Sequence, residues 1–156
     1  MRAVETGIDI AAPPWRVWLV LTDFAAYPAW NPFLTRVQGR PEQGARLRVR
    51  VEPPGRSALV LTPRVVALET GRELRWRSRL LFARGLLDGE HAFELERLAG
   101  GRETRLRHAA RFTGLVAPLA GAAGVLDTTR RGLEAMDAAA KALAERARAG
   151  RARTGA

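Results

Sequence analysis

The stretch from Pro118 to Arg148 constrains the fold more than any other part of this sequence. Apolar and small residues recur in it at intervals of three and four, which is the spacing of one face of an α-helix. They form a stripe of Leu119, Ala122, Leu126, Thr129, Leu133, Met136, Ala140, Leu143 and Ala147. We therefore predict one long amphipathic helix, which needs an apolar surface of its own length to cover that stripe.

The opposite side of this helix is expected to face solvent. It carries the charged residues Arg130, Glu134, Asp137, Lys141 and Glu145. Lys141 is four residues from both Asp137 and Glu145, so these side chains can pair as neighbours on an exposed helix face.

The chain before this helix has the pattern of short β-strands. Residues 3–10 alternate apolar and polar side chains, and Pro13 and Pro14 then end the strand. A short helix is predicted over Pro14–Thr22, because proline is favoured in a first helical turn. Residues 24–33 contain two further prolines and can hold only a single helical turn. Six more strands are predicted at 34–38, 46–52, 57–69, 73–81, 90–98 and 103–113, each followed by turn or loop residues.

This order of elements predicts an α+β fold. Consecutive hairpins form an antiparallel meander, and one helix can cover a seven-stranded sheet only if the sheet curves strongly around it. A chain of 156 residues fits one domain, which we expect to span residues 1–148. Residues 149–156 are expected to form a disordered tail.

The formal net charge of +10 raises the question of nucleic-acid binding. Lys141 is the only lysine, and the arginines are scattered through every segment instead of being clustered in one arm or one recognition helix. Several alternate with apolar residues along the strands, as at positions 46–50 and 75–79. This pattern favours a solvated outer face with cross-strand ion pairs over a nucleic-acid partner.

The sequence contains no cysteine, which excludes disulfides, thiolate catalysis and thiolate metal sites and fits a reducing cytosol. Its first residues lack an apolar leader segment, and the longest weakly polar run is too short to span a membrane. We expect a soluble cytoplasmic protein without a membrane span.

Several motifs resemble one known superfamily. They are residues 8–14, 17–24, 27–33, 73–76, 89–95 and 108–114, and together they cover nearly the whole chain. The sequence resembles the polyketide cyclase/dehydrase and lipid-transport group of the START and birch-pollen-allergen superfamily, also called SRPBCC. The resemblance implies the helix-grip fold, in which a seven-stranded sheet curls around the C-terminal helix and leaves a ligand cavity between them. Members of this superfamily include aromatic cyclases, lipid carriers, hormone receptors and chaperone activators.

Two histidines are the candidate catalytic residues. Strand alternation places His91 and His108 on the inward faces of the last two strands, where both should face the cavity. Imidazoles there are suited to general acid–base chemistry, but a histidine on an apolar face is more often a hydrogen-bonded core residue. The sequence predicts no inward carboxylate to pair with either histidine, and two histidines alone do not make a metal site. We therefore expect no metal and no cofactor.

The predicted ligand-binding residues come from strands, loops and the long helix. They are Trp30, Asn31, Trp76, Phe82, Phe93, Phe112, Leu126, Thr129 and Leu133. The segment from Leu81 to Leu87 is too apolar for a purely solvated loop, so it either closes the cavity mouth or lies in a homodimer interface.

We expect this protein to bind a hydrophobic or aromatic small molecule, lipid or polyketide-like, in the internal cavity, as a carrier or sensor. One alternative is an aromatic polyketide cyclase or dehydratase that uses a cavity histidine as acid and base. A second alternative is a protein-interaction module of the chaperone-activator type.

Overall fold

The computed structural model describes residues 1–81 and 83–154, with side chains described up to Arg146. The strands are β1 (Arg2–Ile10), β2 (Leu34–Gln38), β3 (Arg48–Val51), β4 (Leu59–Leu61), β5 (Arg64–Glu69), β6 (Glu73–Arg79), β7 (Asp88–Leu98) and β8 (Glu103–Thr113). The helices are α1 (Pro14–Thr22), α2 (Tyr27–Trp30), α3 (Ala117–Ala122) and α4 (Val125–Thr154), with single 3₁₀ turns η1 (Phe24–Ala26) and η2 (Ala99–Gly101).

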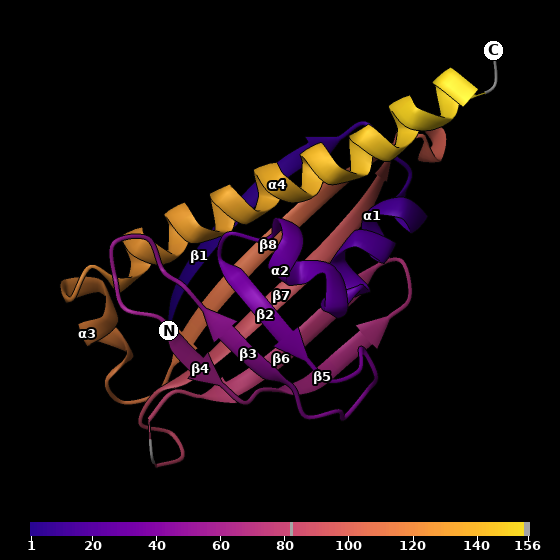
Figure 1. Cartoon of the computed structure of the whole chain (residues 1–156). Helices are drawn as coiled ribbons and strands as arrows, with labels where there is room; N and C mark the ends of the chain where they lie inside the picture. Colours follow the sequence, from indigo (N-terminus) through magenta and orange to yellow (C-terminus); the bar gives the residue numbers. More distant parts are fainter. Residues whose placement is uncertain (82, 155–156) are drawn as a thin grey trace.

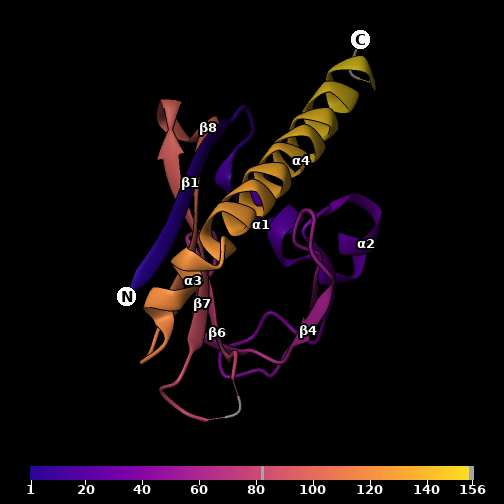
Figure 2. The ribbon, with the colours of Figure 1, turned by 90° about the vertical axis from the view of Figure 1, so that its left-hand side faces the viewer.

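The strands form two antiparallel sheets that face each other below α4 (Figures 1 and 2). The larger sheet has the order β1-β8-β7-β6-β5, and the smaller one has the order β2-β3-β4. Helix α4 runs diagonally along β1 and β8 of the larger sheet, and α1 and α2 also pack against it. The predicted curved antiparallel sheet, long C-terminal helix and two early short helices are thus confirmed.

The predicted strand count was wrong, because the described chain has eight strands where the sequence suggested seven. The segment 57–69, predicted as one strand, is divided at Pro63 into β4 and β5, which belong to different sheets. Proline has no backbone N–H to donate to a ladder, so a strand is readily interrupted there. The sheets remain joined at this point, where Leu47 N donates to Pro63 O at 2.8 Å and Val65 N donates to Ala45 O at 2.9 Å.

The long helix is also divided, in contrast to the single helix predicted from Pro118. Helix α3 ends at Ala122, and Gly124 then adopts a left-handed conformation with φ of +70° before α4 begins. Glycine carries little steric penalty there, which explains why the helix stops at this position. The break turns the first part of the predicted stripe outward, so that Leu119 is 64% exposed.

The far end of α4 differs from the prediction as well. Its helical backbone continues to Thr154, beyond the predicted end at Arg148. The disorder predicted for residues 149–156 stays a prediction, because side chains from residue 147 onward and all of residues 155–156 lie outside the described part. No described helix is both long enough and apolar enough to cross a membrane.

The interior below α4 is filled from Leu133 onward. Leu133 and Met136 are buried against the larger sheet, and they share the core with Val17 and Leu21 of α1. Tyr27 closes this end, with its hydroxyl donating to the Leu21 carbonyl at 2.5 Å. Burial of this amphipathic face is the main source of the helix's stability.

The outer face of the larger sheet carries the predicted ion pairs. Arg107 pairs with Glu96 at 3.2 Å, and Glu90 accepts from Arg77 at 2.7 Å and from Arg111 at 3.3 Å. These cross-strand pairs explain how arginines can occupy neighbouring strands without uncompensated repulsion.

Two leucine truncations test the helix placement. Leu133→Ala should lower the free energy of unfolding by about 2–5 kcal/mol, because Leu133 is fully buried and its loss leaves a cavity. Leu119→Ala is the matched control and should change stability by no more than about 0.5 kcal/mol, because its side chain is exposed. Urea unfolding measures both, and a loss below about 1 kcal/mol for Leu133→Ala would show that the core is misplaced.

Candidate functional site

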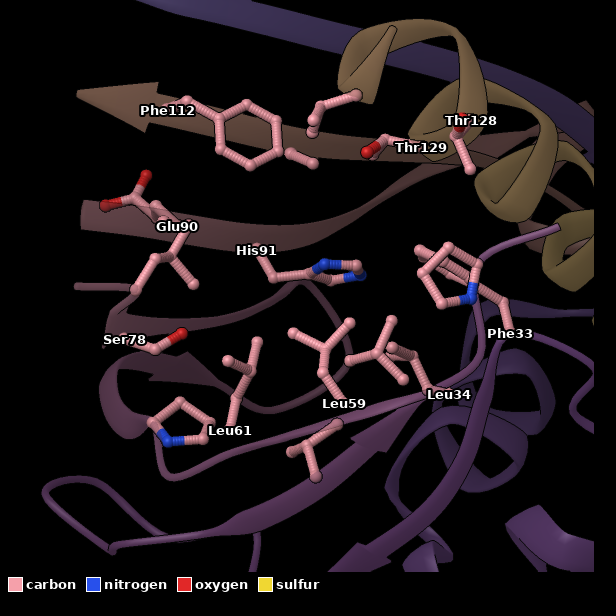
Figure 3. A pocket seen from close by; sticks show the side chains of 18 of the residues that line it. Phe33, Leu34, Leu59, Leu61, Ser78, Glu90, His91, Phe112, Thr128 and Thr129 are labelled. Carbon is pink, nitrogen blue, oxygen red and sulfur yellow. The ribbon is translucent and has the colours of Figure 1, made fainter. Parts of the chain in front are cut away.

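A cavity of about 680 Å³ lies between the two sheets and the first turns of α4 (Figure 3). Its walls come from β2, β3 and β4 on one side and from β6, β7 and β8 on the other, with Val125, Thr128 and Thr129 contributed by α4. Many lining side chains are apolar, among them Phe33, Leu34, Val49, Val51, Leu59 and Leu61.

The cavity forms where several inward side chains of the larger sheet are small. Along β6 the inward side chains change from Leu74 and Trp76 to Ser78. Gly89 of β7 lies opposite Ser78, and Ala110 of β8 lies in the same part of the wall. Large side chains fill the space below α4 from Leu133 onward, whereas these small ones leave room for a ligand.

The side chain of His91 points into this cavity from β7 (Figure 3). Trp76 stacks on its imidazole, with ring centroids 5.4 Å apart and an angle of 15° between the planes. Phe93 lies on another side at 5.0 Å. Burial holds the pKa of His91 well below the ordinary value of 6.5, and the nearby His108 lowers it further. His91 is therefore neutral near pH 7, with a lone pair on one of its two ring nitrogens.

A chain of hydrogen bonds connects His91 to the long helix. Its Nε2 lies 2.5 Å from Nε2 of His108, whose side chain is fully buried behind it. Nδ1 of His108 lies 2.6 Å from Oδ1 of Asp137 on α4. The second oxygen, Oδ2, accepts a hydrogen bond from the Thr6 hydroxyl at 2.6 Å. Thr6 reaches this position because β1 pairs with β8 in a register that sets it opposite His108.

These contacts determine where the protons lie. An ionised Asp137 can only accept hydrogen bonds, so Nδ1 of His108 carries a hydrogen and its Nε2 has a free lone pair. That lone pair accepts the Nε2–H of His91. Nδ1 of His91 is then unprotonated, which makes it the basic atom at the cavity end of the chain.

Asp137 was wrongly predicted to lie on the solvent side of the helix. It is 2% exposed, and its carboxylate pairs with His108, although no inward carboxylate was predicted from the sequence. A signal was present, because Asp137 follows Leu133 by four residues and precedes Ala140 by three, which puts all three on one helix face. The position of Asp137 on the buried helix face, and not its charge, agrees with where its side chain lies.

The predicted ligand-binding residues divide into two groups. Trp76, Phe112 and Thr129 lie on the cavity wall, as does the predicted catalytic residue His91. His108, Phe93 and Leu133 are fully buried and are not among the lining residues, so the prediction that both histidines face the cavity was right for one only.

The remaining predicted residues lie farther from the cavity or outside the described chain. Trp30 packs edge-on against Tyr27 at 5.1 Å, and Asn31 accepts backbone hydrogen bonds from residues 33 and 34 at the start of β2. Leu126 is partly buried against the core. None of these three is a lining residue, and Phe82 lies outside the described residues.

Sequence reasoning missed the smaller sheet as a cavity wall. Leu59 and Leu61 of β4 line the cavity, as do Thr128 of α4 and Arg56 of the β3–β4 loop. The available signal was the alternation of arginine and valine in β3 and the apolar run of β4, which does not show what the strands face. Within the described residues, no group of three histidine or carboxylate side chains is arranged to hold a metal ion.

The β6–β7 loop is connected to the start of α3. Leu115 N donates to Gly85 O at 2.9 Å, and Val116 N donates to Leu86 O at 3.1 Å. Leu80, at the beginning of this loop, lines the cavity. The loop therefore lies beside the start of α3, and its role as gate or dimer interface stays a prediction.

Known proteins share this architecture. The model of the family described as polyketide cyclase/dehydrase and lipid transport matches residues 1–148. Among solved structures, the Zhui aromatase/cyclase from Streptomyces sp. R1128 is 26% identical, with a TM-score of 0.73 over 93% of this chain and 94% of that one. No curated protein matches the sequence.

More distant structures show the same fold. The protein TTHA0849 from Thermus thermophilus is 14% identical, with a TM-score of 0.71 over 94% of this chain and 99% of that one. Ara h 8.0201 is 15% identical, with a TM-score of 0.64 over 92% and 97% of the two chains.

The lowered pKa of His91 predicts how stability depends on pH. Below about pH 6.5 the unfolded chain binds a proton at this residue that the folded protein does not bind, so the free energy of unfolding should decrease as the pH is lowered, until the folded pKa is reached. The contribution approaches about 1.4 kcal/mol per pH unit. Urea unfolding at several values between about pH 5 and pH 7 gives the free energy of unfolding as a function of pH. This free energy should change less with pH for His91→Asn than for the natural protein. An equal dependence on pH in the two proteins would contradict the burial of a neutral His91.

Proposed function

The chain belongs to the polyketide cyclase/dehydrase and lipid transport family, and we propose that it catalyses proton transfer in the cyclisation or dehydration of an aromatic, polyketide-like substrate held in its cavity. The observation that carries this proposal is the hydrogen-bonded chain from Asp137 through His108 to His91. It ends on the wall of an apolar cavity large enough for a small molecule.

A purely structural role accounts poorly for the hydrogen-bonded series of Asp137, His108 and His91. A buried carboxylate loses its hydration, and an apolar residue of similar size usually serves stability as well or better. Asp137 and His108 are almost completely buried, and their hydrogen bonds lead to the one imidazole that reaches the cavity. Perturbed titratable groups directed into a cleft are typical of catalytic sites. The 26% identity to an aromatase/cyclase points to the same class of reaction.

In this proposal, Nδ1 of His91 is the base that contacts the substrate. It removes a proton from a carbon next to a carbonyl group, and the Nε2 proton of His91 passes to Nε2 of His108. The positive charge then lies on His108, beside the carboxylate of Asp137. Thr6 holds the other carboxylate oxygen and so keeps Asp137 aimed at the imidazole.

The reverse transfer completes a dehydration. The electrons of the broken C–H bond form a carbon–carbon double bond as a hydroxyl group leaves the neighbouring carbon. The proton stored on the chain returns through His91 to that hydroxyl, which departs as water. The enzyme regains its starting protonation state, and such a dehydration within a ring already closed by aldol addition leads toward an aromatic ring.

A carrier or sensor role is the second candidate, supported by the apolar lining of the cavity. It needs binding of a hydrophobic or aromatic molecule but no proton transfer. Native mass spectrometry of the purified protein would detect a retained ligand. Turnover that depends on His91 separates the enzyme from the carrier.

Asp137→Asn tests the catalytic chain. The amide is close in shape to the carboxylate but cannot stabilise the charged imidazolium, so kcat for loss of water from a β-hydroxy ketone substrate should fall by about 10²–10⁴-fold. Affinity for N-phenyl-1-naphthylamine, a neutral apolar probe, should change by less than about twofold. The change in kcat without a change in binding is the distinguishing result.

Glu134→Gln is the matched control, because Glu134 is an exposed carboxylate on the same helix. Its turnover should equal that of the natural protein. Turnover in Asp137→Asn equal to this control would refute the catalytic chain, whereas probe binding without any turnover in the natural protein would favour the carrier.

Thr129→Trp tests whether the cavity is the binding site. Thr129 is a partly buried cavity residue, so a larger side chain fills the space without replacing a core residue. The natural protein should bind N-phenyl-1-naphthylamine with about micromolar affinity, or roughly −8 kcal/mol, and the variant should bind it at least about tenfold more weakly. Probe fluorescence measures both values. An unchanged affinity for the probe in a folded variant would show that the probe binds outside the cavity.

A further inference from the structure

Arg56 is a charged cavity residue with no counter-ion in the part of the chain that the structure describes. It lies in the loop between β3 and β4 and forms part of the cavity lining. Its Nε donates to Thr128 Oγ1 at 3.2 Å, and its Nη2 donates to the carbonyl oxygen of Ala123. Both acceptors are neutral, and no carboxylate among the described residues pairs with this guanidinium.

Two other charged residues, Glu90 and Arg111, contribute to the cavity wall from β7 and β8, but their side chains pair on the outer face of the larger sheet. Glu90 accepts from Arg111 at 3.3 Å and from Arg77 at 2.7 Å, so each charge there has an opposite neighbour. Arg56 therefore leaves the cavity with an unbalanced positive charge. A guanidinium has five N–H donors, and the two described hydrogen bonds use only part of that capacity.

The backbone holds Arg56 in a fixed place. Arg56 N donates to Pro53 O at 3.1 Å, and Gly55 between them has φ of +72°. Proline followed by glycine at the two central positions is the sequence of a type II turn. Such a turn is rigid, so the arginine is presented to the cavity without a large loss of backbone entropy when a ligand binds.

We propose that Arg56 binds an anionic group, such as a carboxylate, at one end of an otherwise apolar or aromatic ligand. Thr128, to which Arg56 is hydrogen-bonded, lies on α4 beside Thr129, and Figure 3 shows the two threonines on the helix wall of the cavity that His91 enters from β7. An anion held by Arg56 would leave the apolar part of the ligand to extend toward His91. This inference rests on the proposed cavity but not on catalysis.

The present hydrogen bonds of Arg56 are compatible with this role. Ala123 follows the end of α3, where carbonyl groups lack partners within the helix, so the guanidinium serves as a cap when no ligand is present. An anion offers a stronger, charge-assisted hydrogen bond than a neutral carbonyl. Binding can therefore use the free donors or replace the cap.

Two probes with the same aromatic frame separate charge recognition from cavity shape. 8-Anilinonaphthalene-1-sulfonate carries a sulfonate, and N-phenyl-1-naphthylamine lacks it. Arg56→Met should weaken binding of the anionic probe by about three- to tenfold, because one exposed charged contact is lost. Binding of the neutral probe should change by less than about twofold.

Arg64→Met is the matched control, since Arg64 also donates to a backbone carbonyl, that of Gly44, and does not line the cavity. It removes the same net charge and should leave both affinities unchanged. Arg56→Lys, which retains the charge, should preserve much of the preference for the sulfonate.

Two results would overturn the proposal. Equal weakening of both probes by Arg56→Met would show that Arg56 only supports the cavity, and equal weakening of the anionic probe by Arg64→Met would show that net charge alone is responsible. Absence of turnover would leave these binding results unaffected, so failure of the catalytic proposal and failure of this one can be distinguished.

Discussion

The carboxylate of Asp137 can be buried under α4 only because Thr6 and His108 both hydrogen-bond to it. Removing one partner of a buried pair of this kind typically costs about 3–5 kcal/mol, since the other partner stays buried without compensation. The contact joins the helix to β1 and β8, so it also fixes how far α4 is rotated. That rotation directs Leu133 into the core and Thr129 to the cavity.

The same helix covers two kinds of interior. From Leu133 onward it covers side chains of α1 that pack against the larger sheet, whereas its first turns cover the cavity. Gly132 marks the transition, because a Cβ atom there would overlap the ring of Phe33, which lines the cavity from the start of β2. Close approach of helix and ring thus separates the packed part from the hollow part.

Local patterns predicted most elements, and contacts between distant elements account for the errors. The bounds of α1, β2 and β8 agree with the predictions, because prolines, turn residues and strict alternation determine them locally. Asp137 was misplaced because a charged residue on a helix is normally solvated, and its two partners come from strands far away in the sequence. The division between β4 and β5 was likewise hidden, since a strand's sequence does not state to which sheet it belongs.

The break between α3 and α4 connects the fold to the candidate ligand site. An uninterrupted helix would use its carbonyl groups internally, and Ala123 would then offer no acceptor to Arg56. The left-handed Gly124 ends that pattern and leaves the carbonyl available. Arg56 consequently links the smaller sheet to the beginning of α4, across the cavity from the larger sheet. The cavity thus has a cation without a described counter-ion beside its helix wall and a neutral base on its strand wall, which suits an aromatic molecule with one anionic end.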